Sequence, residues 1–315
     1  MDILCVGQMV ADILIQGVDE VDFSVDTKRV KSIVIKNGGD CLNTAIDLQY
    51  LGNDVGFAGA LGADAMGDFL SQTLKSHGID DSGIKYVNDC ETSTVAAIIN
   101  LKGERVFLYY GGTNDIFCFE HINQDMVRKA KFIHVGGTYL LPRFDGVGAT
   151  KLFELAHEYG KFTSMDVTWD TTGKWMEIIE PCLKHLDLFM PSINEAKEIA
   201  GTEVPEEIAD FLKKKGVKNV IIKLGKDGCY VNAFGEEFYQ PSYKVKVVDT
   251  TGAGDSFVAG VLTGLNQGWN IRKSVQFASA VSAKCIQKLG ATTGVPSFGE
   301  VIKFIEEYNK IKTLY

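Results

Sequence analysis

Short apolar runs alternate with amphipathic segments along most of this 315-residue chain, and this alternation constrains its fold more than any other feature. The runs are four to six residues long, which is typical of strands that are buried on both faces. Between several of them, apolar residues recur at helical spacing. We therefore expect an α/β fold with a central, mostly parallel sheet flanked by helices. The runs cover residues 3–6, 55–60, 132–135, 162–166, 186–190 and 220–224.

Two segments interrupt the alternation. Residues 12–36 alternate apolar and charged side chains, and residues 94–112 read as a hairpin around Lys102-Gly103-Glu104. No Pro- or Ser-rich linker sets them apart, so we expect residues 1–315 to form a single domain that carries them as a small antiparallel β lid. Exposed strand edges of such a lid can pair with a second copy of the chain, which predicts a homodimer through the lid.

Charge and cysteine content argue against several classes of protein. The 32 basic and 41 acidic side chains leave a formal net charge of −9, which disfavours binding to nucleic acid or to an anionic membrane. The seven cysteines show no Cys-x-x-Cys spacing, as is usual in a reducing compartment. No apolar run approaches the roughly 18 residues of a membrane span, and the N-terminus does not resemble a secretory signal. We expect a cytoplasmic protein with no membrane partner.

The segment DTTGAGDSF, residues 249–257, carries the strongest chemical signal. Gly252, Ala253 and Gly254 have little or no side chain, so their backbone N–H groups can approach an anion at the start of a helix. Asp255 would repel that anion. A catalytic role removes the conflict: the carboxylate takes a proton from a hydroxyl while the N–H groups stabilise the charge on the group being transferred. Capping of the helix by Asp255 is the alternative interpretation.

Other motifs that could use this segment lack residues they need. No Gly-Lys pair belongs to a G-x-x-x-x-G-K-[ST] loop. Phe257 stands where a dinucleotide fingerprint requires glycine. Ser256 has neither a G-x-S-x-G elbow nor a histidine partner motif, which disfavours a serine hydrolase.

Three motifs, in order, resemble the ribokinase family of carbohydrate kinases, also called the phosphofructokinase B type. Residues 249–257 resemble its C-terminal signature, residues 37–45 (NGGDCLNTA) its N-terminal glycine pair, and residues 223–228 (KLGKDG) its nucleotide-side strand and turn. The resemblance implies a ribokinase-like fold and an ATP- and Mg²⁺-dependent kinase acting on a primary hydroxyl of a sugar or sugar acid. A nucleoside kinase, with Tyr109 and Tyr110 stacking the base, and a catalytically weak sugar- or nucleotide-binding protein are the alternatives.

The resemblance also assigns roles to matched residues. Asp255 would be the general base, and Gly252, Ala253 and Gly254 the anion hole for the γ-phosphate. Glu195 would bind Mg²⁺ directly or through water. The substrate would be bound by Asp12, Gly38, Gly39, Asp40 and Asn43, the nucleotide by Lys223, Gly225 and Gly228, and a monovalent cation such as K⁺ by Asp249 and Thr251.

Departures from the family pattern bear on the substrate. Ser192 stands where the family often has an Asn ahead of Glu195, so the function of that Asn is unassigned. True ribokinases tend to have Lys at position 40 and Asn at position 10, whereas this chain has Asp40 and Val10, so ribose is not the expected substrate. Arg105 and Arg143 are either surface arginines or the groups that hold a carboxylate or phosphate of the substrate.

Overall fold

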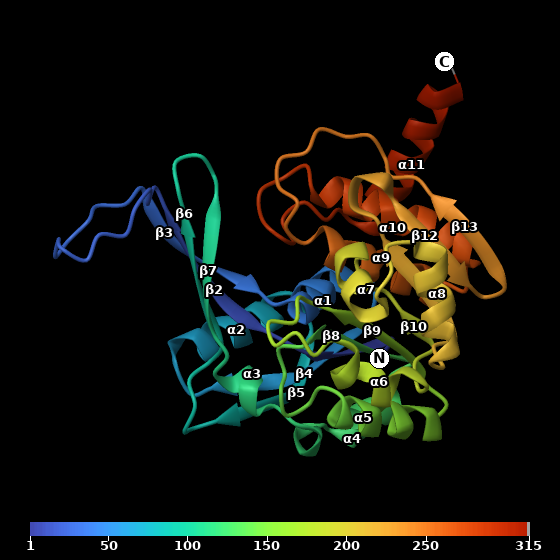
Figure 1. Ribbon diagram of the computed structural model, residues 1–315, viewed down its shortest axis with the longest axis horizontal. Coiled ribbons are helices and arrows are strands. Elements are labelled where there is room, and N and C mark those ends of the chain that lie inside the picture. The colour runs from blue at the N-terminus through green and yellow to red at the C-terminus, as the bar shows by residue number, and fades with distance from the viewer. Residues whose placement is uncertain (314–315) are drawn as a thin grey trace.

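One nine-stranded sheet forms the centre of the computed structural model, which describes residues 1–313. The strand order is β13-β12-β11-β10-β9-β8-β1-β4-β5. The seven strands that begin with β11 in this order all pair in parallel, and β12 and β13 add an antiparallel hairpin at the edge next to β11. The expected α/β fold with a mostly parallel sheet is confirmed (Figure 1). Bounds are β1 (Ile3–Gly7), β4 (Val55–Gly62), β5 (Asp80–Val87), β8 (Phe132–Thr138), β9 (Phe162–Val167), β10 (Leu188–Phe189), β11 (Asn219–Lys223), β12 (Cys229–Ala233) and β13 (Glu236–Gln240).

The apolar runs form the inner strands because both of their faces are covered. Every residue of β1 and β4 is buried. The run at 186–190 pairs over only two residues, Leu188–Phe189. Strand β5 was not anticipated, because it lies at the sheet edge and exposes half of its residues, so no apolar run reveals it.

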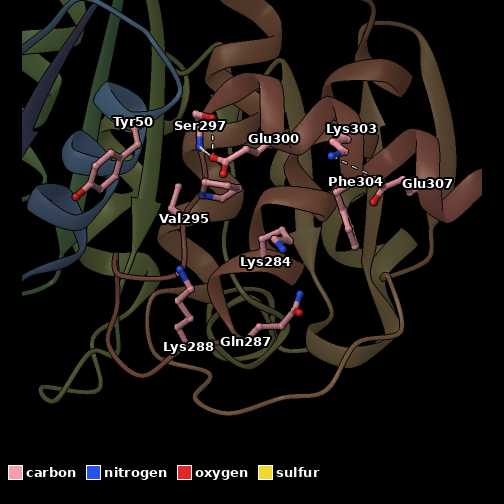
Figure 2. A pocket seen from close by; sticks show the side chains of 12 residues that line it. Tyr50, Lys284, Gln287, Lys288, Val295, Ser297, Glu300, Lys303, Phe304 and Glu307 are labelled. Carbon is pink, nitrogen blue, oxygen red and sulfur yellow. Dashed lines mark hydrogen bonds and ion pairs between the residues drawn. The ribbon is translucent and has the colours of Figure 1, made fainter.

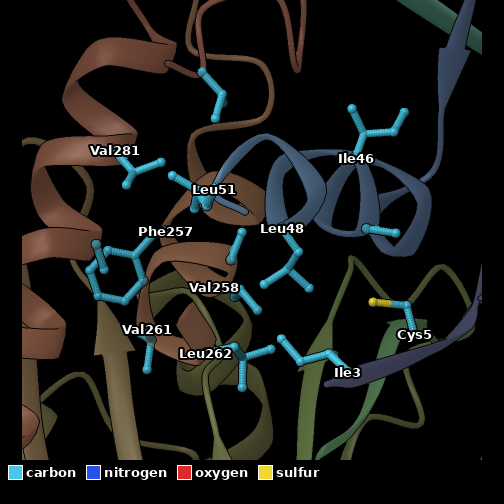
Figure 3. Packing of buried hydrophobic residues seen from close by; sticks show 14 of the residues in the cluster. Ile3, Cys5, Ile46, Leu48, Leu51, Phe257, Val258, Val261, Leu262 and Val281 are labelled. Carbon is cyan, nitrogen blue, oxygen red and sulfur yellow. The ribbon is translucent and has the colours of Figure 1, made fainter. Parts of the chain in front are cut away.

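Helices cover both faces of the sheet and create two separate cores. One core contains side chains of α1, α2, α9, α10 and α11 (Figure 3), and the other those of α4 to α8. None of the helices within residues 1–313 combines the length and apolar character needed to cross a membrane. Bounds are α1 (Asp40–Tyr50), α2 (Ala65–Ser76), α3 (Thr113–Ile116), η1 (Phe119–His121), α4 (Gln124–Lys129), α5 (Val147–Glu158), α6 (Met176–Leu183), α7 (Ile193–Ala200), α8 (Pro205–Lys214), η2 (Gly225–Asp227), α9 (Ala253–Asn266), α10 (Ile271–Cys285) and α11 (Phe298–Thr313).

A second sheet, the lid, consists of β2 (Val10–Gln16), β3 (Ser32–Gly38), β6 (Thr94–Ile99) and β7 (Arg105–Tyr110). It projects from the main sheet at one side of the molecule (Figure 1). Its order is β3-β2-β6-β7, and the β2–β3 and β6–β7 pairs are antiparallel as expected, but the central β2–β6 pair is parallel. The reason is that β2 and β6 follow β1 and β5, which run in the same direction in the main sheet.

The lid leaves apolar side chains uncovered. Ile33, Ile35, Val106 and Leu108 are all exposed, and alternate spacing puts the two residues of each strand on one face of that strand. This surface is compatible with the homodimer expected from the sequence, which stays a prediction.

Asp47 is an anomaly in the core between α1 and α9. Its side chain is fully buried, and within residues 1–313 neither of its carboxylate oxygens has a hydrogen-bond partner. Burial raises the pKa of Asp47 well above its usual value. The native protein therefore holds a proton there that the unfolded chain releases above about pH 4.

The variant Asp47→Asn is expected to raise the free energy of unfolding by about 1–3 kcal/mol at about pH 8. The unfolded wild-type chain binds fewer protons than the native state in this range, so wild-type stability should fall as pH rises. The difference in free energy of unfolding between the variant and the wild type should accordingly shrink as the pH falls toward about 4. Urea unfolding at several pH values tests this, with the exposed Asp89→Asn as control; a difference independent of pH would contradict it.

Candidate active site

Two adjoining cavities lie at the carboxyl ends of β9 and β11, the edge at which parallel α/β sheets usually bind ligands. The first, about 490 Å³, is polar. The second, about 440 Å³, has a largely apolar lining. Lys223, Gly225 and Gly254 border both, so one extended ligand could occupy the two together. Carboxylates in the polar cavity come from Asp40, Asp166, Glu195 and Asp255.

The N-terminus of α9, where we expect the anion hole, lies where these two cavities adjoin. Gly252 is the N-cap with φ of 76°, and a Cβ there would collide with the carbonyl oxygen of Ala291, so only glycine fits. The N–H groups of a first helical turn have no partner inside the helix and carry partial positive charge. Of the three residues, Ala253 already donates its N–H to the carbonyl oxygen of Thr250, at 3.2 Å.

Asp255, in the first turn of α9, lies against α1. It is 9% exposed, and its Oδ2 accepts a hydrogen bond from Nδ2 of Asn43 at 2.9 Å. The Asn43 amide is oriented in turn by Asn37, whose Nδ2 donates to Oδ1 of Asn43 at 3.3 Å. Burial raises the pKa of Asp255 to about 6, although the Asn43 bond opposes this. The carboxylate is thus mainly ionised at neutral pH and basic enough to take a proton from a positioned hydroxyl.

Lys223 forms a buried ion pair that the sequence analysis missed. At the end of β11, its Nζ donates to Oδ2 of Asp166, at the end of β9, at 2.5 Å. A Cβ added to Gly254 would lie 3.4 Å from the same Nζ, so the ammonium is beside the anion hole. Burial alone would lower the pKa of Lys223, but Asp166 and Glu195 raise it, so the ammonium stays charged.

Glu195 has a structural role as well as its expected place in the polar cavity. In the first turn of α7, its Oε2 accepts the N–H of Ser192 at 2.7 Å, and Ser192 caps the same helix, forming a capping box. Burial raises the pKa of Glu195 to about 7. At the position where the family often has an Asn, Ser192 therefore caps α7 and provides no side-chain amide to the cavity.

The polar cavity offers the oxygen donors that Mg²⁺ prefers, since Glu195, Asp166 and Asp40 all line it. Within residues 1–313, however, no group of three or more His, Cys, Asp and Glu side chains could hold a metal by itself. Magnesium is often bound by one or two carboxylates, phosphate oxygens and water, and the residues present fit that mode.

The expected acceptor residues lie where the lid joins α1, and two of them, Asp40 and Asn43, are close to Asp255. The Asp12 carboxylate on β2 lies against Gly38, where a Cβ would collide with it. Gly39 is the N-cap of α1 with φ of 92°, and Asp40 is the first residue of that helix. Burial raises the pKa of Asp12 to about 6. Asp40 lies close to Asp255 and Asp166, and burial together with these charges raises its pKa well above the usual value.

Asp249 and Thr251, expected to bind a monovalent cation, form a tight turn just before the anion hole. Oδ1 of Asp249 accepts the N–H and the hydroxyl of Thr251 at 3.0 and 2.7 Å, and its Oδ2 accepts the N–H of Gly290 at 3.0 Å. Arg105 reaches this turn from the lid, with Nη1 donating to Oγ1 of Thr251 at 3.0 Å. A K⁺ site here stays a prediction.

The expected nucleotide residues border the apolar cavity. Gly225 begins η2 and Gly228 follows it. A Cβ on Gly228, which has φ of 96°, would collide with the carbonyl oxygen of Gln240. The sequence did not predict most of the apolar wall of this cavity, because its residues come from a loop and two helices and share no sequence pattern. This wall consists of Tyr243, Val245, Val247, Phe257, Ala283 and Ile286.

Two aromatic candidates, Tyr109 and Tyr110, and one basic candidate, Arg143, border neither cavity. The Tyr110 hydroxyl donates to Oε2 of Glu91 at 3.0 Å, and Tyr110 alternates with Tyr109 along β7, so both rings cannot stack on one ligand. Arg143 is exposed and borders neither cavity.

A third cavity, of about 720 Å³, lies against α10 and α11 (Figure 2). Both of its carboxylates already have partners: Glu300 accepts hydrogen bonds from Ser297, and Glu307 pairs with Lys303. Glu300 lies in the first turn of α11, but its carboxylate is engaged by Ser297 at the start of that helix, so this cavity is not the candidate active site.

Comparisons with known proteins find carbohydrate kinases by sequence and by fold. The sequence model described as "pfkB family carbohydrate kinase" matches residues 1–297. Fructokinase-1 of Zea mays is 28% identical over 285 residues, covering 86% of this chain and 88% of that protein. An ATP-dependent 6-phosphofructokinase of Thermoanaerobacterium thermosaccharolyticum is 27% identical over 317 residues, covering 99% of this chain and 95% of that protein. Arabidopsis thaliana ribokinase, solved with ribose and ATP, superimposes with a TM-score of 0.85 at 25% identity, covering 96% and 98% of the two chains.

Proposed function

Because this chain belongs to the pfkB family of carbohydrate kinases, and is thus a phosphotransferase with a hydroxyl acceptor, we propose that it transfers the γ-phosphoryl group of ATP to a primary hydroxyl of a sugar or sugar acid. The observation that carries this proposal is the Asp255 carboxylate, held by Asn43 beside the anion hole of Gly252 and Gly254. A base and an anion hole side by side suit a reaction that deprotonates one group while charge develops on another.

In the proposed reaction, Asp255 accepts the proton of the acceptor hydroxyl as its oxygen attacks the γ-phosphorus. The bond from that phosphorus to the β–γ bridging oxygen breaks, and ADP leaves. The N–H groups at the start of α9 and the ammonium of Lys223 stabilise the equatorial oxygens. Mg²⁺ near Glu195, when bound, would neutralise phosphate charge. The apolar cavity would take the adenine, and Asp12, Asp40 and Asn43 would bind the acceptor.

The test is ADP release from MgATP with a panel of neutral sugars, sugar acids and nucleosides, with and without K⁺. We expect turnover on a sugar or sugar acid, with ribose inferior to the best substrate because Asp40 adds an acidic group. Chelation of Mg²⁺ should abolish the turnover. Preference for a nucleoside would replace the sugar proposal, and ATP binding without any turnover across the panel would favour a binding protein.

A further inference from the structure

Arg105 makes a connection that the family resemblance does not assign. It lies at the start of β7 in the lid, yet its Nη1 donates to Oγ1 of Thr251 at 3.0 Å and its Nη2 lies 3.9 Å from Oδ1 of Asp249. Among residues 1–310, and leaving Asn309 aside, no other hydrogen bond or ion pair joins the strands of the lid to the chain beyond residue 130. Among these polar contacts, one side chain therefore connects the lid to the phosphate side of the site.

The hydrogen bonds at this contact have a consistent direction. The Thr251 hydroxyl donates to Oδ1 of Asp249, which leaves its lone pairs to accept from Arg105. The chain of donors thus runs from the guanidinium through the hydroxyl to the carboxylate. The ring of Phe107, two residues along β7, lies 5.7 Å from the guanidinium carbon and supports the arginine on the same side of the strand.

The contacted turn leads directly into the anion hole. Thr251 precedes Gly252, whose backbone is packed so closely against Ala291 that no Cβ fits. Thr251 and Gly252 share a peptide unit, and Gly252 is the N-cap of α9. A shift of Thr251 is therefore transmitted to the N–H groups at the start of that helix. Phosphoryl transfer depends on the position of such groups, and a misplacement of about 1 Å can cost about a hundredfold in rate.

The contact is also weak enough to open and close. The Arg105 side chain is 41% exposed, and ion pairs with such exposure contribute little to stability. Asp12, which we place at the acceptor, belongs to the same sheet: β2 pairs with β6, and β6 with β7. An acceptor that holds β2 against the site would therefore also hold Arg105 on Thr251.

We infer that Arg105 is a positioning residue that couples closure of the lid on the acceptor to the arrangement of the anion hole. This inference rests on the proposed kinase function. It assigns Arg105 to the loop at residues 249–251 rather than to a carboxylate or phosphate of the acceptor, the role considered from sequence.

The variant Arg105→Ala tests this inference, with Lys102→Ala, at the exposed β6–β7 turn, as the matched control. We expect Arg105→Ala to lower kcat ten- to a hundredfold, by the sensitivity of such reactions to misplacement, and to leave the Kd for ATP within about twofold. Guanidinium chloride in the millimolar range, at constant K⁺, should restore a measurable part of the lost kcat in Arg105→Ala and should not raise the kcat of the wild type or of Lys102→Ala. A rise in acceptor KM with unchanged kcat would make Arg105 an acceptor ligand and overturn the inference.

A readout independent of turnover separates this inference from the proposed function. With a non-hydrolysable ATP analogue bound, the amides of residues 250–254 should exchange hydrogen faster in Arg105→Ala than in the wild type, and Lys102→Ala should not change them. Equal exchange in all three proteins would overturn the coupling even if the enzyme is an active kinase. Faster exchange in a protein that phosphorylates nothing would retain the contact and reject the proposed reaction.

Discussion

Replacement of Asp255 by asparagine is expected to reduce kcat by about 10²–10⁴-fold while leaving the binding of ATP and acceptor nearly unchanged. The asparagine has almost the same shape, and its oxygen can still accept the hydrogen bond that Asn43 donates at 2.9 Å. It cannot accept the proton of the acceptor hydroxyl. Single-turnover phosphoryl transfer, with ATP and acceptor affinities from calorimetry, measures the two effects separately.

The matched control is Asp47→Asn, which changes another buried aspartate near Asp255 but does not border either cavity. It should retain turnover. In the wild type, burial raises the pKa of Asp255 to about 6, so kcat/KM should rise with pH through that region as the base form accumulates. Near-normal turnover in Asp255→Asn would rule out the carboxylate as the base.

Replacement of Lys223 by methionine is expected to lower the free energy of unfolding by about 3 kcal/mol at neutral pH and to abolish measurable turnover. The variant would leave Asp166 buried without its cation, in a cavity that also contains Asp40, Glu195 and Asp255. Removing one member of a buried pair costs more than the pair contributes, because the remaining charge is poorly solvated.

The pH dependence of this variant gives a second check. Without the ammonium, the carboxylates of the cavity should hold protons to higher pH in the native state than in the unfolded chain, so the loss of stability should grow as pH rises. Urea unfolding of Lys223→Met and of the exposed Lys214→Met, at several pH values, measures the difference. Equal stability of the two variants at neutral pH would show that Asp166 does not depend on Lys223.

Local patterns in the sequence were sufficient for much of the fold. The apolar runs became inner strands because a strand covered on both faces must be apolar throughout, as β1 and β4 are. The edge strand β5 and the apolar wall of the second cavity have no such pattern. The lid was found from its alternation, but the parallel β2–β6 pair depends on how the two strands leave the main sheet.

The same division holds for the site. The sequence alone determined that a helix would begin after Gly252 with Asp255 in its first turn, because a run of small residues followed by apolar residues at helical spacing is a local pattern. Only the tertiary structure decided the partners of the charged groups: Asn43 with Asp255, Lys223 with Asp166, and Arg105 with Thr251, separated by 212, 57 and 146 residues. Periodicity records which side of an element is buried, whereas these contacts depend on the register and direction in which distant elements pack together.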